Sequence, residues 1–188
     1  MPKTRSNLVF FLAATALLLA GCSAADAQAN DDALPNDGPL VLDHHGSACL
    51  PYPRFDHVAL GTRMDVSGRK PVRILSVTPR RTLNADIESE SVMASEPSNR
   101  LFAYSWPLDK TYGRPWKEAI PAIGASLPAG SSTDLVTEVQ PVIAGKTVHI
   151  PTVRIIYRVE GGGTFRADSD YQLVMSTLHC SDSDSLTD

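Results

Sequence analysis

The 188-residue sequence has no apolar run long enough to span a membrane and no excess of basic residues. Its longest apolar run, Leu8–Ala20, has 13 residues, whereas a spanning helix needs roughly 20. Lysine and arginine together number 17, against 21 aspartates and glutamates, which gives a net charge of −4. Because surfaces that bind nucleic acid are usually basic, this balance argues against a nucleic-acid partner.

The sequence also lacks the common catalytic motifs. It has no G-x-S-x-G turn that would expose a nucleophilic serine, and no H-E-x-x-H zinc motif. The glycine run Gly161-Gly162-Gly163 lacks the lysine and the following helix that a phosphate-binding loop needs. These absences favour a non-enzymatic protein, and the sequence indicates no cofactor.

The chain begins with an export signal. Lys3 and Arg5 give a positive start, and the apolar run then closes on Leu19-Ala20-Gly21-Cys22. This end resembles the lipobox of bacterial lipoproteins. The resemblance implies that residues 1–21 are removed, and that Cys22 takes a lipid and becomes the first residue of a protein attached to the extracytoplasmic side of a membrane of the cell envelope.

A competing interpretation is ordinary secretion. Ala27-Gln28-Ala29 is an A-x-A cleavage site, and a cut there releases a soluble secreted or periplasmic protein that begins at Asn30. Residues 22–40 are rich in small and polar residues without an apolar period, which is typical of a flexible tether. Residues 181–188 are predicted to form a disordered acidic tail.

Three cysteines are present, and Cys22 is the expected lipid attachment site. Cys49 and Cys180 are then an even pair in an exported protein, which predicts a disulfide across the folded part, residues 41–180. A closed loop of about 130 residues would stabilise the fold by up to about 5 kcal/mol. The alternative is a pair of unpaired buried thiols.

Alternation of apolar and polar residues predicts an all-β fold. Such alternation runs through residues 72–77, 101–106, 135–142 and 153–159. The last run is followed by the three glycines and by residues 164–178, a pattern that indicates a β-hairpin. With 14 prolines spread between short extended runs, we expect an immunoglobulin-like β-sandwich of about seven strands. At most one short helix is expected, over 114–123, with Pro115 in its first turn and Pro121 limiting its length.

Histidines are the candidate metal ligands, because imidazole nitrogen binds copper and zinc. His44 and His45 are adjacent, and His57, His149 or His179 could supply a third ligand. Neighbouring residues on a strand point to opposite faces, so this site requires a turn at the pair. An envelope protein that binds copper or zinc, with His44, His45 and His149 as ligands, is therefore an alternative function. The other interpretation is that these histidines are structural or solvated.

Three acidic residues, Asp86, Glu88 and Glu90, alternate along one predicted strand. Alternation places their carboxylates on one face, where they could serve a cell-wall-acting enzyme or a calcium site. The simpler interpretation is a solvated edge, since like charges deter edge-to-edge pairing.

Basic residues gather locally in an otherwise acidic chain. The local cluster consists of Arg63, Arg69, Lys70, Arg73, Arg80 and Arg81. Three further arginines could join it, namely Arg154, Arg158 and Arg166. Such a patch would contact anionic headgroups or cell-wall polymers near the anchor; alternatively, it is the polar face of strands paired with acids. The aromatic series Phe102, Tyr104 and Trp106 is expected in the core rather than on a ligand-stacking surface.

Together these features predict a lipid-anchored envelope protein whose β-sandwich is a non-enzymatic binding or assembly module. Its partners would be the membrane, through the lipid, and an envelope protein or a cell-wall polymer. The ligand itself is not indicated by the sequence.

Overall fold

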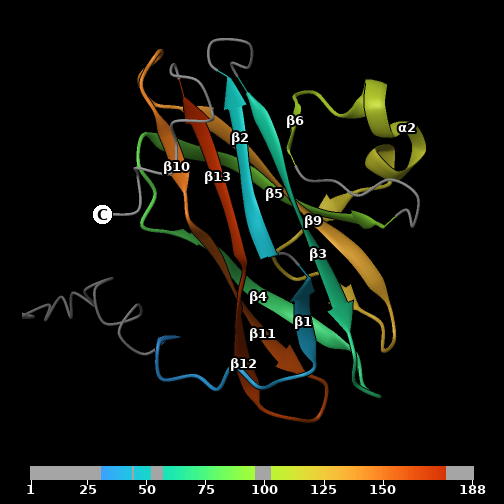
Figure 1. The fold of residues 1–188 in the computed structure, drawn as a ribbon. Helices are drawn as coiled ribbons and strands as arrows, with labels where there is room; N and C mark the ends of the chain where they lie inside the picture. Colours follow the sequence, from blue (N-terminus) through green and yellow to red (C-terminus); the bar gives the residue numbers. More distant parts are fainter. Residues whose placement is uncertain (1–30, 44, 52–56, 96–102, 177–188) are drawn as a thin grey trace, which may run out of the picture.

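Two layers of β-sheet form the domain (Figure 1). The computed structural model describes residues 31–43, 45–51, 57–95 and 103–176. The first layer is a six-stranded sheet. Its strands, in spatial order, are β1 (Leu40–Asp43), β3 (Val58–Val66), β9 (Ser132–Pro141), β5 (Ala85–Ala94) and β7 (Ile120–Pro121), with β6 (Ala103–Ser105) also paired to β3.

The second layer consists of two smaller sheets. One has the order β12 (Thr164–Asp168), β11 (Thr152–Val159), β4 (Val72–Arg80) and β8 (Ser126–Leu127). The other has the order β10 (Val148–Ile150), β13 (Asp170–Ser176) and β2 (His45–Pro51). Figure 1 shows β4, β11 and β12 at the lower end of the view and β10, β13 and β2 above them.

One interrupted hairpin joins these two smaller sheets. One arm consists of β10 and β11, and the other consists of β12 and β13. Across the hairpin, β10 pairs antiparallel with β13, and β11 pairs antiparallel with β12. At the interruption, the Val153 amide donates to the Ser169 hydroxyl at 2.9 Å, and the Ser169 amide donates to the Val153 carbonyl at 2.9 Å. The turn at Gly161–Gly163 closes the hairpin, as the sequence predicts.

The strand order is that of an immunoglobulin-like domain. The order β1-β3-β9-β5 in one layer and β4-β11-β12 in the other corresponds to the two sheets of a seven-stranded immunoglobulin domain. Strand β2, which follows β1 in sequence, joins the other layer by pairing parallel to β13. Strands β6 to β8 and the helix are additions between β5 and β9. The predicted all-β, immunoglobulin-like fold is confirmed.

Side chains from all three sheets meet in one core. Leu60 of β3, Leu135 of β9, Ile74 of β4, Ile155 of β11 and Leu173 of β13 each have 1% or less of their surface exposed. The predicted alternation places Val153, Ile155 and Tyr157 of β11 on this side of the sheet. Burial of this apolar surface between the layers is the main stabilising contribution.

The helix begins and ends earlier than predicted. It is α2 (Asp109–Lys117), with a break at Gly113 (φ 49°), so that Pro115 lies in the first turn after the break. Tyr112 of the helix and Leu108, the residue directly before it, pack against the outer face of the six-stranded sheet, in a second apolar cluster with Ala59, Met93 and Val136. The predicted end at residue 123 is wrong because residues 120–121 pair with β5 as β7. No helix among the described residues is long and apolar enough to cross a membrane.

Residues 31–40 belong to the folded domain, although the sequence predicts a tether over 22–40. Asp32 forms ion pairs with arginines of the second layer, and the Arg166 amide donates to the Pro35 carbonyl at 2.9 Å. Strand β1 begins at Leu40. This packing depends on contacts with distant strands, which composition does not reveal.

The remaining predictions for the two ends lie outside the described residues. They are the signal of residues 1–21, the lipid on Cys22, the Cys180 end of the bridge whose other cysteine, Cys49, lies on β2, and the tail of residues 181–188. Each of them stays a prediction.

Candidate functional site

An arginine-rich face lies on the outer side of the sheet β12-β11-β4-β8. Here the term arginine face denotes Arg73 and Arg80 of β4, Arg154 and Arg158 of β11, and Arg166 of β12. Their strand neighbours, such as Ile74 and Ile155, point to the core, so alternation directs Arg73, Arg154, Arg158 and Arg166 outward. A bulge in β4 between Ile74 and Ser76 shifts the alternation by one residue, so that Arg80 lies on the same outer side. Five of the nine basic residues singled out in the sequence are therefore brought onto one surface.

Arg63 does not belong to this face. It lies on β3 in the other layer, where its Nε donates to the Ser95 hydroxyl at 3.1 Å and lies 4.0 Å from the Asp134 carboxylate. Burial raises the pKa of Asp134, and the hydrogen bond from Ser95 and the charge of Arg63 offset part of this increase. This cluster therefore lies on the outer side of the first layer, away from the arginine face.

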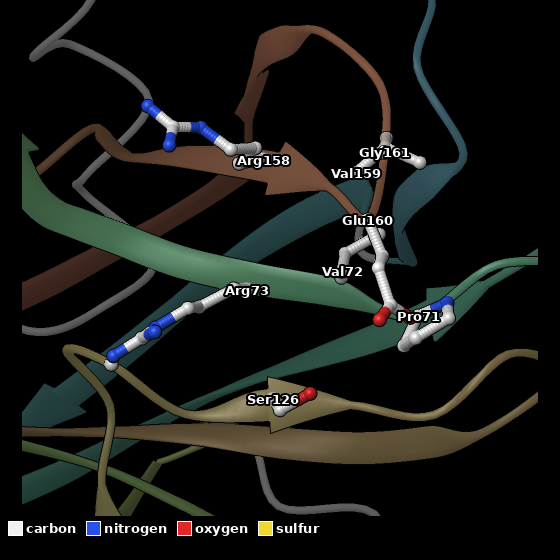
Figure 2. Close-up of a pocket in the computed structure, with 9 residues that line it drawn as sticks. Pro71, Val72, Arg73, Ser126, Arg158, Val159, Glu160 and Gly161 are labelled. Carbon is white, nitrogen blue, oxygen red and sulfur yellow. The ribbon is translucent and has the colours of Figure 1, made fainter.

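Arg73 and Arg158 form one end of the arginine face. They are direct partners in the register of β4 and β11, and both are exposed. They line a hollow of about 510 Å³ together with Ser126 and Glu160. Figure 2 shows the two arginine side chains extending to the same side of the hollow, with Glu160 at the opposite end.

This end of the face carries uncompensated positive charge. Among the described residues, neither Arg73 nor Arg158 forms an ion pair. Like charges directly opposite each other on neighbouring strands are destabilising. Lys70 adds a further charge beside the hollow, since a Cβ placed on the lining residue Gly161 would lie 3.7 Å from the Lys70 Nζ. A bound anion would relieve this repulsion.

The other end of the face is neutralised in part by two aspartates. Arg154, which is 8% exposed, donates from Nε and Nη2 to the two carboxylate oxygens of Asp168 at 2.6 and 2.9 Å. Its Nη1 donates to the carboxylate of Asp32. Arg80 and Arg166 each approach the same Asp32 carboxylate, at 3.6 and 3.5 Å. We call Arg80, Arg154, Arg166, Asp32 and Asp168 the Asp32 cluster.

The sequence offered a signal for only one of these aspartates. Asp168 lies directly opposite Arg154 in the β11–β12 hairpin, so the hairpin register alone would have paired them. Asp32 lies 122 residues from Arg154, and no local pattern connects the two residues.

The candidate metal ligands are not brought together by the residues that the structure describes. His45 pairs with Asp170 and His149 with Val174, on opposite sides of β13, so their backbones are separated by about 13 Å along the strand direction alone. His149 lies 3.5 Å from the Gln172 side chain, and His57 lies 3.3 Å from Glu138. Residues 44 and 179 lie outside the described residues. No group of three potential ligands occurs within the described ranges.

The three alternating carboxylates do not share one face, and this prediction is wrong. A bulge shifts the register of β5 between Ile87 and Ser89. Beyond the bulge Glu90 therefore lies on the side of Val92, which is in the core, and burial raises the pKa of Glu90. A bulge reverses the direction of the following side chains, so Asp86 and Glu90 cannot act as a pair.

A serine, a histidine and a glutamate do meet, on the outer side of the first layer. The Ser89 hydroxyl donates to Glu138 at 2.8 Å, and the His57 Nδ1 lies 3.3 Å from the other oxygen of that carboxylate. In a nucleophilic triad the imidazole lies between the serine and the carboxylate. Here the carboxylate lies between them, so the histidine is not placed to activate Ser89.

The aromatic residues that are described, Tyr104 and Trp106, are half-buried against the second apolar cluster rather than inside the main core. Tyr104 meets Tyr112 edge to face with 5.5 Å between ring centroids, and Trp106 meets Trp116 at 5.1 Å. These rings join α2 to the first layer. Phe102 lies outside the described residues.

Comparisons with known proteins add similarity of fold and no family. No family model matches the sequence, and no curated protein matches it. Among solved structures, the chain is similar to the VesB protease of Vibrio cholerae (TM-score 0.41, 12% identity, 81% of this chain and 35% of that chain). It is also similar to a PapD-like domain of human CEP192 (0.39, 11%, 76% and 87%) and to the adhesin CfaE of enterotoxigenic E. coli (0.33, 9%, 74% and 48%). The chain thus spans about a third of the protease, and no activity is carried over from these proteins.

Proposed function

We propose that this chain is a lipid-anchored envelope protein whose immunoglobulin-like domain is a non-enzymatic binding module for anionic polymers of the cell envelope. The proposal of an anchor rests on the export signal and on Cys22. The proposal of a binding module is supported by the fold and by the arginine face. Within the described ranges, Glu138 lies between Ser89 and His57, which is not the order of a nucleophilic triad.

The observation that carries the choice of ligand is the pairing of Arg73 with Arg158. Two exposed arginines lie directly opposite each other, over a hollow, without an acidic partner among the described residues. Guanidinium groups bind carboxylate and phosphate oxygens in a bidentate manner. Because the pair lies in a hollow rather than on a protruding tip, an extended polymer fits it better than a flat lipid surface.

The anchor is tested by mass spectrometry of the protein isolated from its own envelope. We expect an N-terminus at Cys22 that carries acyl chains. A chain that begins at Asn30, or one with the signal intact, would contradict the anchored state.

Polymer binding is tested by sedimentation of the mature Cys22→Ser chain with purified cell-wall sacculi. The variants Arg73→Gln and Arg158→Gln should each lower the fraction bound several-fold, and binding should weaken with added salt. Glu160→Gln should increase binding, because it removes a negative charge from the hollow. Arg114→Gln is the matched control, since Arg114 lies on α2 and pairs with Glu118 at 2.8 Å.

Vesicles containing anionic lipid provide the second arm of this experiment. Equal binding by the Arg73→Gln variant and the parent chain to sacculi would refute the proposed site. Arginine-dependent binding to vesicles but not to sacculi would assign the face to headgroups instead of polymers.

A further inference from the structure

The Asp32 cluster has the features of an anion site that is already occupied. Asp32 lies in the segment before β1, and its side chain is 55% exposed, whereas that of Arg154 is 9% exposed. The arginines come instead from β4, β11 and β12. A carboxylate on a peripheral segment thus inserts into a basic site built on the rigid sheet.

Asp32 satisfies only part of this site. Its carboxylate is hydrogen-bonded to Arg154, but its oxygens lie 3.6 Å from Arg80 and 3.5 Å from Arg166. The Nη1 of Arg80 and the Nε of Arg166 are buried and have no hydrogen-bond partner among the described residues. Buried donors without an acceptor are costly, so a ligand with more oxygen atoms would gain hydrogen bonds that Asp32 does not provide.

Space and charge also favour an external anion. A hollow of about 320 Å³ lies beside the cluster, lined by Arg80, Arg81, Arg154 and Asp32 among others. Three arginines face two aspartates in the cluster, which leaves one positive charge while Asp32 is bound and two when it leaves. Asp168 stays in place, because its two hydrogen bonds with Arg154 lie within the hairpin.

We propose that Arg80, Arg154 and Arg166 form a binding site for carboxylate ligands, which Asp32 occupies as an internal ligand. A carboxylate-bearing ligand displaces Asp32 and frees the segment before β1 from the sheet. The contacts that this displacement breaks include the donation from Arg166 Nη1 to the Asp32 carbonyl at 2.9 Å. The site lies at the opposite end of the arginine face from Arg73 and Arg158, and the proposal depends neither on that pair nor on the lipid.

The test is titration calorimetry of the mature Cys22→Ser chain with citrate. Asp32→Asn removes the internal competitor, and the affinity for citrate should rise by about tenfold if Asp32 occupies the site nine-tenths of the time. Asp31→Asn is the matched control, because it removes the same charge one residue away, where no arginine pairs with it among the described residues. Equal affinities in these two variants would overturn the proposal.

The location of binding needs a second variant. Arg80→Gln in the Asp32→Asn background should abolish the gain, and this variant should fold because Arg80 is not the buried bidentate partner. Retention of the gain would place citrate elsewhere and refute the site. Arg73→Gln should leave citrate binding at the Asp32 cluster unchanged, so failure here and failure of polymer binding at Arg73 are distinguishable.

The displacement of Asp32 can be monitored by hydrogen exchange at the Arg166 amide, because this amide donates to the Pro35 carbonyl. Citrate should accelerate this exchange in the parent chain; unchanged exchange at saturating citrate would contradict displacement. A hexa-aspartate peptide, used in place of citrate, tells whether the site accepts carboxylates of a polypeptide as well as those of a free acid.

Discussion

Gly38 lies so close to Tyr157 that no larger residue fits between the two. A Cβ added at Gly38 would lie 2.1 Å from the tyrosine hydroxyl and 2.7 Å from the ring of Phe165. The same hydroxyl accepts a hydrogen bond from the Leu40 amide at 3.2 Å. The segment before β1 therefore contacts the second layer through the close packing of Gly38 against Tyr157 as well as through the ion pairs of Asp32.

Gly38→Ala should destabilise the domain by about 1–3 kcal/mol, the usual cost of overpacking a site that cannot relax. Urea unfolding measures the change. Gly163→Ala is the control, because its added methyl group would meet Phe165 at an ordinary 3.5 Å. Equal changes in the free energy of unfolding for the two substitutions would show that Tyr157 and Phe165 leave room for a methyl group at Gly38.

Arg154→Lys should lower the free energy of unfolding by about 1–2 kcal/mol although it keeps the charge. The ammonium group cannot reproduce the bidentate pair with Asp168 and the bond to Asp32 at once. Arg158→Lys, on the same strand and exposed, should change stability by less than about 0.5 kcal/mol. A loss no larger than that of the control would count against this geometry.

Acidification should release the segment before β1. The hydrogen bond from Arg154 is the main cause that holds the pKa of Asp32 below its ordinary value, with the charges of Arg80 and Arg166 adding to it. A lowered pKa in the folded state means that the stabilisation is present at neutral pH and lost as pH falls through that pKa. Exchange at the Arg166 amide should therefore accelerate at low pH, after correction for the intrinsic rate. Asp32→Asn should remove the difference between neutral and acidic pH.

Glu90→Gln should stabilise the protein at pH 7. Burial raises the pKa of Glu90, so the folded state favours the neutral carboxyl, and this contribution is lost as pH rises through the raised pKa. Because Glu90 is only half-buried, the gain at neutral pH should be small. It should disappear near pH 3, where both side chains are neutral. Glu88→Gln, at an exposed position in the bulge, should have little effect at either pH.

Cys49→Ser should lower the free energy of unfolding by up to about 5 kcal/mol if the predicted bridge to Cys180 closes the domain. Cys180→Ser should have the same effect, and the double substitution should cost no more than either alone. Additive losses would indicate two separate thiols. Mass measurement before and after reduction checks the bridge directly.

The alternation of residues determined where the second layer lies in the sequence. Runs such as 72–77 and 153–159 become β4 and β11 because their apolar side chains face one core. The glycine run after Val159 made the hairpin predictable, and with it the pairing of Arg154 and Asp168. These features are local, so a single sequence carries them.

Only the tertiary structure decided which charges meet. The bulge in β5 reverses Glu90 relative to Asp86, and alternation cannot reveal an inserted residue. Asp32 reaches Arg154 across 122 residues, because the sandwich brings the segment before β1 against β12. The same packing left Arg73 and Arg158 exposed side by side while it neutralised Arg154 in part. Charge in the sequence specifies how many arginines there are, whereas strand order and register specify which of them keep a partner.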